Sequence, residues 1–307
     1  MSLFSLLAAL LLEHFNPLTN RIRLYLHFAR YADFLERHFN AGEHRHGMIA
    51  WMLAAVPSVV AVAGVYSALY HISPLLGLAW NAAVLYATMG FKYFSNTSNG
   101  IAQALKEQNL DRARSLLAGW REHPADELEA NEIARVAIEQ TLAWSHRQIF
   151  AVLLWFVLLG AGGAVLYRIA SILNHRWGGL ERADVGDFAR FAARAFAWLD
   201  WIPVRLSAIS FAVVGDFEDA MYCWRSQAAA WADRSQGILL AAGAGALGVK
   251  LGEPLHQHGS VEFRSELGLG DEADPDYVQS AVSLIWRALV LWLALLSLLQ
   301  VGQWVGS

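Results

Sequence analysis

A long run without any charged residue is the feature that most limits what this chain can fold into. From Met48 to Phe91 the sequence contains no Asp, Glu, Lys or Arg in 44 residues. One helical crossing of a bilayer takes about 20 apolar residues, so the run is long enough for two crossings. The sequence "HISP", from His71 to Pro74, predicts the turn between them. The run therefore predicts a helical hairpin in a membrane.

Two further uncharged stretches, Ile149–Tyr167 and Ala288–Ser307, each predict one more membrane-spanning helix. The composition agrees, because only 16% of the residues are charged, whereas an ordinary soluble domain carries about 25%. The 13 tryptophans also fit, since Trp concentrates at membrane–water interfaces. We therefore predict an all-α, polytopic integral membrane protein with about four to six membrane-embedded helices.

Two other apolar segments do not fit a simple crossing. Ser2–Leu12 is uncharged but has only 11 residues, so it could be a short tilted span, a half-inserted helix or a packed core helix. Trp198–Gly215 is apolar but contains Asp200, Pro203 and Arg205. A charge inside a membrane segment is costly unless it faces protein or water. We therefore predict that this second segment is broken or re-entrant.

The polar intervals between these segments suggest how the chain is organised. We predict one membrane domain over residues 1–307, with an extramembrane helical insertion at 92–147 and an extramembrane segment at 216–279. The insertion has apolar residues at helical spacing, and Asn109 and Asp126 are candidate helix caps. The interval His14–Gly47 carries five arginines against three acids, which favours a cytoplasmic position.

Several classes of partner and site are disfavoured by the composition. The net charge of −4 and the lack of a dense basic block argue against nucleic acid as a partner. The single cysteine, Cys223, allows no intrachain disulfide and no cysteine-based metal site. The pairs His44/His46 and His256/His258 lack an obvious third ligand, so we predict no metal site. The lipid bilayer is the predicted partner, and a homo-oligomer is compatible with the sequence.

The glycine stretch "GAGALG" at residues 243–248 matches the dinucleotide-binding pattern G-x-G-x-x-G. That pattern needs a strand before it and a helix after it, but an alanine-rich, helix-prone segment precedes it here. Two other interpretations remain open. The glycines could let the backbone approach an anion, with a lysine nearby, or they could let helices pack closely. The candidate residues are Gly245, Gly248, Lys250, Gly252 and Glu253.

Three charged residues outside this stretch are also candidates. Arg135 and Glu139 are spaced i, i+4, which is typical of a surface ion pair, although an arginine fork also suits a phosphate. Arg205 follows "DWIP" in an apolar segment. It could extend to the membrane interface or line a substrate cavity.

Three stretches resemble the CobD/CbiB family of adenosylcobinamide-phosphate synthases. They are "AGALGVKLGEP" (Ala244–Pro254), "LDWIPVRLSAISFAVVGDFEDAMYCW" (Leu199–Trp224) and "IARVAIEQTLAWSHRQIFAVLLWFVLLGAGGAVLYR" (Ile133–Arg168). The second stretch and "LFSLLAALLLEHF" (Leu3–Phe15) also resemble the related AmpE proteins. Asn16-Pro17 occupies the place of an Asp-Pro in the synthases.

The resemblance implies a multi-pass protein of the bacterial inner membrane that serves cobalamin biosynthesis. A synthase of this family attaches an aminopropanol arm to adenosylcobyric acid with ATP and Mg²⁺, so a corrinoid would be the ligand. The residues themselves specify no cofactor. The resemblance implies that the following residues contact phosphate or carboxylate groups: Arg135, Glu139, Arg205 and Lys250, with Gly245, Gly248, Gly252 and Glu253 beside them.

Some positions depart from the family pattern. Ala143, Trp144 and Arg147 stand where the synthases have Glu-Asn and a following Asp, and acidic residues are the usual ligands of Mg²⁺. The AmpE resemblance implies a different role, a non-catalytic regulator linked to β-lactamase or cell-envelope signalling. The sequence therefore supports two hypotheses, a synthase of cobalamin assembly and a regulatory membrane protein.

Overall fold

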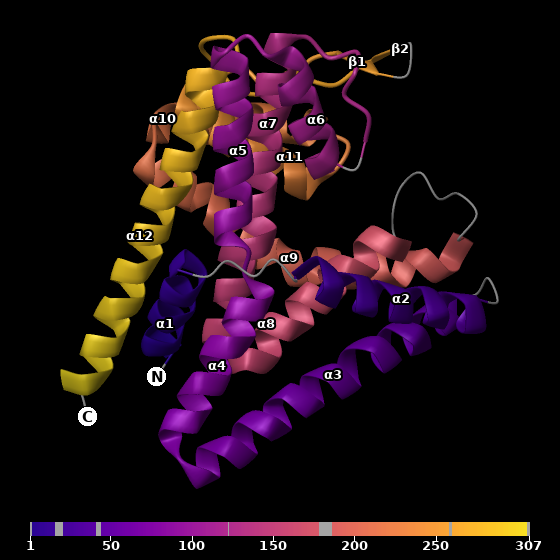
Figure 1. Ribbon diagram of the computed structural model, residues 1–307, viewed down its shortest axis with the longest axis vertical. Helices are drawn as coiled ribbons and strands as arrows, with labels where there is room; N and C mark the ends of the chain where they lie inside the picture. The colour runs from indigo at the N-terminus through magenta and orange to yellow at the C-terminus, as the bar shows by residue number, and fades with distance from the viewer. Residues whose placement is uncertain are drawn as a thin grey trace. The chain divides into compact units, whose positions relative to one another are not determined.

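The structure is a computed structural model that describes residues 2–15, 21–40, 44–121, 123–177, 186–257 and 260–305 (Figure 1). The chain forms two compact units. Unit 1 contains Met1–Gly90 and Arg147–Ile202, and unit 2 contains Phe91–His146 and Pro203–Ser307. Each unit is therefore assembled from two separate stretches of the chain.

The predicted all-α fold is confirmed. Within the described residues, five helical stretches are long and apolar enough to cross a membrane, which agrees with the predicted number of embedded helices. They are Arg45–Ile72, Pro74–Lys106, Ala130–Trp177, Phe188–Val214 and Pro275–Gly302.

Unit 1 is built around a helical hairpin. Its helices are α1 (Ser2–Phe15), α2 (Arg21–Phe39), α3 (His44–Ile72), α4 (Pro74–Thr88), α8 (Ala151–Trp177) and the first part of α9 (Gly186–Val214). Helix α3 packs against α4, α8 and α2, and Figure 1 shows α3 and α4 meeting at a sharp turn. The short apolar segment at the N-terminus is α1, which packs against α4.

The predicted turn at "HISP" is confirmed in atomic detail. Helix α3 ends at Ile72, and Ser73 caps α4 by accepting a hydrogen bond from the backbone N–H of Leu75 at 3.3 Å. Pro74 is the first residue of α4, where its missing N–H costs nothing and its fixed φ suits the helix. Local capping chemistry therefore positions the hairpin.

One prediction about a single segment is confirmed and one is wrong. The predicted span Ile149–Tyr167 lies within the candidate membrane span Ala130–Trp177, and Gly160, with φ 67° and ψ −157°, kinks α8 inside it. The predicted break in Trp198–Gly215 does not occur, since α9 runs without interruption through Pro203. Asp200 is buried, and the hydroxyl of Tyr167 donates a hydrogen bond to it at 2.7 Å. The acid is therefore satisfied by protein and does not require a broken helix.

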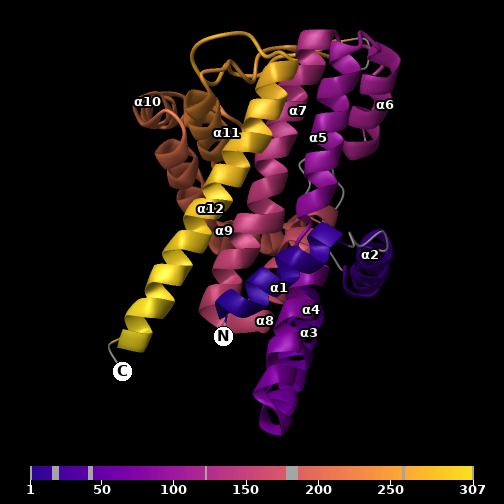
Figure 2. The ribbon, with the colours of Figure 1, turned by 60° about the vertical axis from the view of Figure 1, so that its left-hand side comes forward.

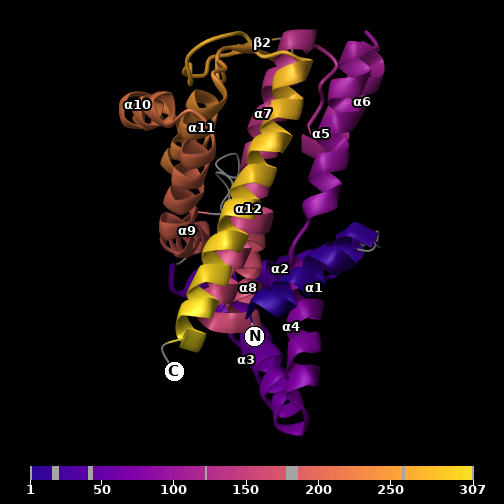
Figure 3. The same cartoon turned by 90° about the vertical axis from the view of Figure 1, so that its left-hand side faces the viewer.

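Among the described residues, unit 2 combines the last part of α9 and six further α-helices with shorter elements. These are α5 (Phe91–Lys106), α6 (Leu110–Arg121), α7 (Ala130–Ser145), α10 (Phe217–Gln227), η3 (Ala228–Ala230), α11 (Arg234–Leu247), β1 (Leu255–Gln257), β2 (Ser260–Glu262) and α12 (Pro275–Val305). Helix α12 lies beside α7 in Figures 2 and 3 and contacts α5, α7 and α11. The two strands form a small antiparallel hairpin with Leu255 opposite Glu262.

Helices α5, α6 and α7 confirm the predicted helical character of the interval after Phe91. Asn109 caps α6 as predicted, because its Oδ1 accepts a hydrogen bond from the N–H of Arg112 at 3.1 Å. The prediction that Asp126 caps the next helix is wrong, since α7 begins after Glu129. Helix α12 begins at Pro275, well before the predicted start at Ala288. Whether the interval lies outside the membrane, as the domain prediction states, stays a prediction.

Candidate functional site: an ionic cluster on helix α7

One face of α7 carries three charged residues that are all buried. Glu132, Arg135 and Glu139 are spaced i, i+3 and i+7, and their exposed fractions are 7%, 8% and 5%. The expectation of a surface pair between Arg135 and Glu139 is therefore wrong. Burying a charge is costly unless it is paired and hydrogen-bonded. The partners of these residues define the site.

The carboxylate of Glu139 is held by the segment that follows α11. It accepts a hydrogen bond from the backbone N–H of Gly252 at 2.9 Å. The guanidinium of Arg264 donates to both of its oxygens, at 2.7 and 3.3 Å. Three donors, two of them charge-assisted, satisfy this buried carboxylate. Glu139 therefore ties α7 to a segment more than a hundred positions away in the sequence.

Arg264 also fixes the backbone around it. Its Nη2 donates to the carbonyl of Gly252 at 2.8 Å, and its Nε donates to the carbonyl of Glu253 at 3.1 Å. The guanidinium lies 5.6 Å from the ring centre of Trp231, within the range of a cation–π contact. Arg264 therefore donates four hydrogen bonds that hold Glu139 and the backbone of Gly252 and Glu253 together.

Arg135 makes the second tie between α7 and this segment. Its Nη1 forms an ion pair with Glu253, and its Nη2 donates to the carbonyl of Pro254 at 2.8 Å. Glu132 lies 4.0 Å from the same guanidinium. The Nε of Arg135 is buried and has no hydrogen-bond partner among the described residues. Arg135 therefore keeps one donor that the described part of the protein does not use.

Glu132 closes the arrangement at the start of α7. It accepts from the N–H of Glu129 at 2.9 Å, and its other oxygen bonds the N–H of His256 at 3.2 Å and its Nδ1 at 2.9 Å. The hydrogen bond with Glu132 raises the pKa of His256, and the negative charges of Glu132, Glu129 and Glu127 act in the same direction. We call the six residues joined in this way the ionic cluster: Glu132, Arg135, Glu139, Glu253, His256 and Arg264.

The backbone at the centre of the cluster is left-handed at two consecutive residues. Gly252 has φ 74° and Glu253 has φ 59°. Such a φ is unusual for a residue with a side chain and costs of order 1 kcal/mol or more. A Cβ at Gly252 would lie 2.0 Å from the carbonyl oxygen of Ser265. The segment is therefore held in a demanding conformation that presents Glu253 to Arg135.

The glycine stretch lies at the end of α11 and serves packing. A Cβ at Gly245 would lie 2.5 Å from the carbonyl oxygen of Asp219 and 2.7 Å from the Cα of Ala220. Gly248, with φ 69°, ends α11 as its left-handed cap. A helix precedes the stretch and no helix opens from it, so the dinucleotide pattern is a coincidence.

The backbone amides after this cap are already in use. The N–H groups of Gly248 and Val249 bond to carbonyls of α11, and that of Lys250 bonds to the carbonyl of Asp271. Leu251 pairs with Leu267, and Gly252 donates to Glu139. Of the two interpretations left open by the sequence, close packing is therefore the one that the structure supports, since no run of free amides remains for an anion.

The other predicted residues lie around or away from the cluster. Lys250 adjoins it in sequence, and its ammonium is 3.7 Å from Glu266, with both side chains well exposed. Arg205 is half-buried on α9. Thus Arg135, Glu139 and Glu253 belong to the ionic cluster and Gly252 donates a hydrogen bond to it, whereas Gly245, Gly248, Lys250 and Arg205 do not belong to it.

The sequence analysis missed Glu132, His256 and Arg264. Glu132 could have been found, because it continues the polar line of Arg135 and Glu139 on a face of α7 that otherwise consists of apolar neighbours. Arg264 lies in a polar loop with no periodic pattern, so nothing local marks it as buried. His256 is half of a predicted loop pair, while His258, like Asn16 and Pro17, lies outside the described residues.

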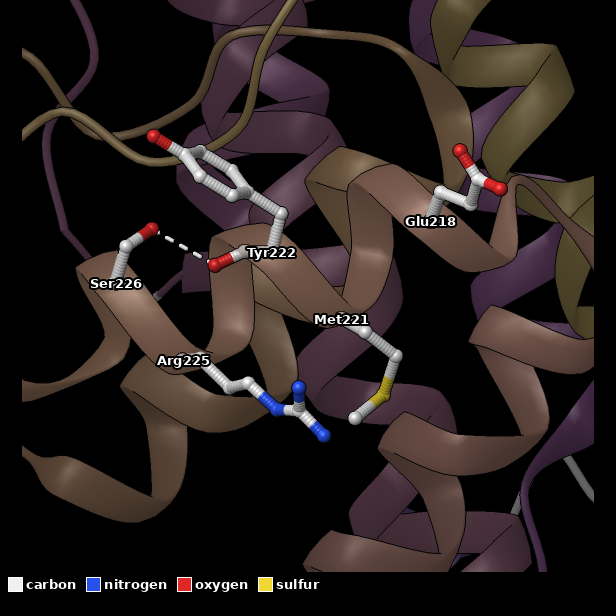
Figure 4. A pocket seen from close by; sticks show the side chains of 5 residues that line it. All are labelled: Glu218, Met221, Tyr222, Arg225 and Ser226. Carbon is white, nitrogen blue, oxygen red and sulfur yellow. Dashed lines mark hydrogen bonds between the residues drawn. The ribbon is translucent and has the colours of Figure 1, made fainter.

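Two further features were considered as sites. Among the described residues, no group of three His, Cys, Asp or Glu side chains is close enough to hold a metal ion. A shallow hollow of about 480 Å³ lies along α10 (Figure 4) and is lined by Glu218, Met221, Tyr222, Arg225 and Ser226. All its lining residues come from one helix, and Figure 4 shows their side chains diverging, so it lacks the converging groups of a ligand pocket.

The chain is similar in sequence to proteins of one known family. Residues 6–285 match the family model described as "CobD/Cbib protein". A "Cobalamin biosynthesis protein CobD" from Stutzerimonas stutzeri is 35% identical over 303 residues, which cover 96% of this chain and 97% of the relative.

Two other relatives are more distant or shorter in their match. A protein of the same name from Chromobacterium violaceum is 36% identical over 222 residues, which cover 72% of this chain and 71% of the relative. A "Probable cobalamin biosynthesis protein CobD" from Methanothrix thermoacetophila is 29% identical over 237 residues, covering 74% and 71%. No solved structure matches the chain significantly.

Proposed function

The chain belongs to the CobD/CbiB family of cobalamin biosynthesis proteins, and from this premise we propose that it acts as the family's synthase. The proposed reaction joins the amine of an aminopropanol-derived arm to a carboxyl group of adenosylcobyric acid. ATP transfers a phosphoryl group to the carboxylate. The amine nitrogen then attacks the carboxyl carbon and loses a proton, and phosphate leaves with one of the carboxyl oxygens. The proposed location is the bacterial inner membrane, and the proposed ligand is a corrinoid.

One observation supports this proposal above the others. The stretches Ile133–Arg168 and Ala244–Pro254, which carry the resemblance to the synthases, are far apart in the sequence, yet Arg135 and Glu139 of the first contact Gly252, Glu253 and Pro254 of the second. The two stretches that resemble the synthases are therefore in contact with each other at the ionic cluster. We assign the substrate site to the surroundings of the ionic cluster.

The residues of the cluster divide into two proposed roles. Glu139 and Arg264 are hydrogen-bonded to each other and to the backbone of the segment, so we assign them to holding the segment in place. Arg135 keeps its Nε donor, and Lys250 carries an ammonium on a side chain that is 39% exposed. These two cations suit the carboxylate and phosphate groups of the proposed substrates.

The cluster does not supply a resident Mg²⁺ site. Each of its three carboxylates is already engaged with an arginine, a histidine or backbone N–H groups, and Mg²⁺ requires free oxygen ligands in octahedral geometry. Ala143 and Trp144, where the family has acidic or amide side chains, offer no ligand either. We therefore derive no step through Mg²⁺ from this cluster, and ATP with Mg²⁺ remains part of the proposal.

Complementation tests the proposal. A bacterium lacking its cobinamide-phosphate synthase is supplied with the corrin precursor and grown on a carbon source that requires cobalamin. We expect the wild-type chain to restore growth. We expect Lys250→Ala and Arg205→Ala to reduce growth while the protein still inserts into the membrane. Arg112→Ala, at an exposed residue of α6, is the matched control and should grow like the wild type.

Failure of the wild-type chain to restore growth, with the protein verified in the membrane, would contradict the synthase. That result would favour the non-catalytic, AmpE-like regulator. Full growth of both Lys250→Ala and Arg205→Ala would instead leave the reaction in place but remove these two residues from its site. The two failures are therefore distinguishable.

A further inference from the structure

Helix α2 of unit 1 has one face on which the described side chains, those from residue 28 onward, are exposed. Its inner face is made of Ala29, Ala32 and Leu35, which are almost fully buried because α2 packs against α3 and α8. Figure 1 shows α2 running beside the first part of α3. The described side chains on the opposite face are exposed, and they are Arg30, Tyr31, Phe34, Arg37 and His38. We call this set the basic-aromatic face.

The charged side chains of the basic-aromatic face are all basic. It contains two arginines, a histidine and two aromatic rings, and no acid. The acids of α2 lie off this face, because Asp33 and Glu36 are half-buried and Asp33 lies 3.8 Å from Arg176 of α8. The ring of Phe34 stacks on His38 with centroids 4.0 Å apart. Positive charge and apolar ring area are thus presented together on one surface.

The basic-aromatic face lies next to exposed apolar side chains of α3. The hydroxyl of Tyr31 donates a hydrogen bond to the carbonyl of Leu53 at 3.3 Å. At the same level, α3 begins a row of exposed apolar side chains, Met48, Ile49, Met52 and Val56, and α3 is a candidate membrane span. The basic-aromatic face is therefore continuous with the end of a surface suited to lipid tails.

We propose that the basic-aromatic face binds the phosphate headgroups of anionic phospholipids at the membrane surface. Arginines next to a membrane surface attract anionic headgroups, and amphipathic rings such as that of Tyr31 lie at the level of the headgroups. The interval His14–Gly47 has an excess of arginine over acid, which favours the cytoplasmic leaflet, where anionic lipids are enriched. Helix α2 is then an in-plane anchor of unit 1.

The test uses the full-length protein with one reactive cysteine on this face. Cys223 is fully buried, and burial together with Asp219 raises its pKa to about 11, so a maleimide at neutral pH labels an introduced cysteine and leaves the native one. A fluorophore on Phe34→Cys is measured after reconstitution into vesicles. The vesicles contain tail-brominated phosphatidylglycerol or, at the same mole fraction, tail-brominated phosphatidylcholine.

We expect brominated phosphatidylglycerol to quench the label about threefold more strongly than brominated phosphatidylcholine. The preference should fall to parity in Arg30→Gln/Arg37→Gln and at high salt, because salt screens surface charge. It should persist in Arg112→Gln/Arg225→Gln, which removes the same charge from unit 2. Equal quenching by both lipids in the parent protein would overturn the anionic specificity. Quenching by aqueous iodide without any quenching by lipid would overturn the membrane contact itself.

Discussion

Helices α3 and α7 place their side chains in opposite ways. Helix α3 exposes apolar side chains along much of its length, with Val60 at 63% exposure and Met52 at 47%. Helix α7 buries Glu132, Arg135 and Glu139 to below a tenth of their surface. In water the exposed apolar surface of α3 would be unfavourable, and the buried charges of α7 would be unfavourable without partners. Here α3 has the length and composition to meet lipid, while α7 meets the protein's own charged loop.

The contrast shows which of the two helices depends on specific partners. An apolar side chain gains from lipid without any particular contact, so α3 tolerates changes that preserve hydrophobicity. A buried charge needs a partner of the right sign in the right place. The fold of unit 2 around α7 therefore depends on individual side chains, and that of α3 depends on composition.

Removing one cation of the cluster tests this difference most strongly. In Arg264→Ala, the buried carboxylate of Glu139 would keep only the N–H of Gly252 as a partner. Breaking a buried ion pair from one side costs about 3–5 kcal/mol. We expect a loss of that size in equilibrium unfolding of the purified protein in mixed micelles.

The exposed pair of Arg112 and Glu107 on unit 2 supplies the control. Their atoms are 3.5 Å apart, and both side chains are about half exposed. Arg112→Ala should lower the unfolding free energy by less than about 1 kcal/mol. Equal losses in the two variants would mean that the charges on α7 are no more dependent on partners than a surface pair.

Much of the membrane fold could be predicted from the sequence. The uncharged run Met48–Phe91 and Ser73-Pro74 fix the hairpin of α3 and α4 through hydropathy and local capping, which are properties of neighbouring residues. The kink at Gly160 was not predicted, and the continuity of α9 through Pro203 was predicted incorrectly. Both depend on what packs beside the segment, and a hydropathy profile does not contain that information.

The candidate site was predictable only in part, for a related reason. Arg135, Glu139, Gly252 and Glu253 were selected from spacing and resemblance, and the structure brings them together. Their burial was not predicted, because the i, i+4 spacing of Arg135 and Glu139 is the same on a wet surface and in an interior. Arg264 was missed because its role arises from contacts with residues far away in the chain.

A charge placed on α3 tests the other side of the comparison. Val60 is exposed in the middle of α3, and a lysine at the centre of a membrane helix costs about 2.5–3.5 kcal/mol to insert. We expect Val60→Lys to lower the inserted fraction in a membrane-insertion assay, whereas Val60→Leu should insert like the wild type. Normal insertion of Val60→Lys would mean that this surface of α3 faces water or a polar cavity.

Two glycine substitutions sharpen the comparison at a smaller scale. A Cβ at Gly245 of α11 would meet backbone atoms of Asp219 and Ala220, so Gly245→Ala should destabilise the protein by about 1–3 kcal/mol through overpacking. A Cβ at Gly64 of α3 would meet nothing within 4 Å, so Gly64→Ala should be neutral or stabilising by up to about 1 kcal/mol. Thermal unfolding in detergent measures both. A loss at Gly64 would reveal a partner for α3.

The smallest effect concerns the pH dependence of the ionic cluster. The hydrogen bond with Glu132 raises the pKa of His256 above its ordinary value, which is about 6.5. Charged His256 then stabilises the fold fully below about pH 6.5, and that contribution is lost as the pH rises through the raised pKa. The loss should be small, since the side chain is 58% exposed.

His256→Gln should remove this part of the pH dependence. The unfolding midpoint of the wild type should fall slightly between about pH 6 and pH 8, and the variant should lack that component of the fall. His123→Gln, at an exposed histidine before α7, should keep the wild-type profile. Identical profiles for the wild type and His256→Gln would show that Glu132 is held by Arg135 and the backbone alone. The stability of the cluster would then depend on the buried ion pairs of α7 and not on the protonation of His256.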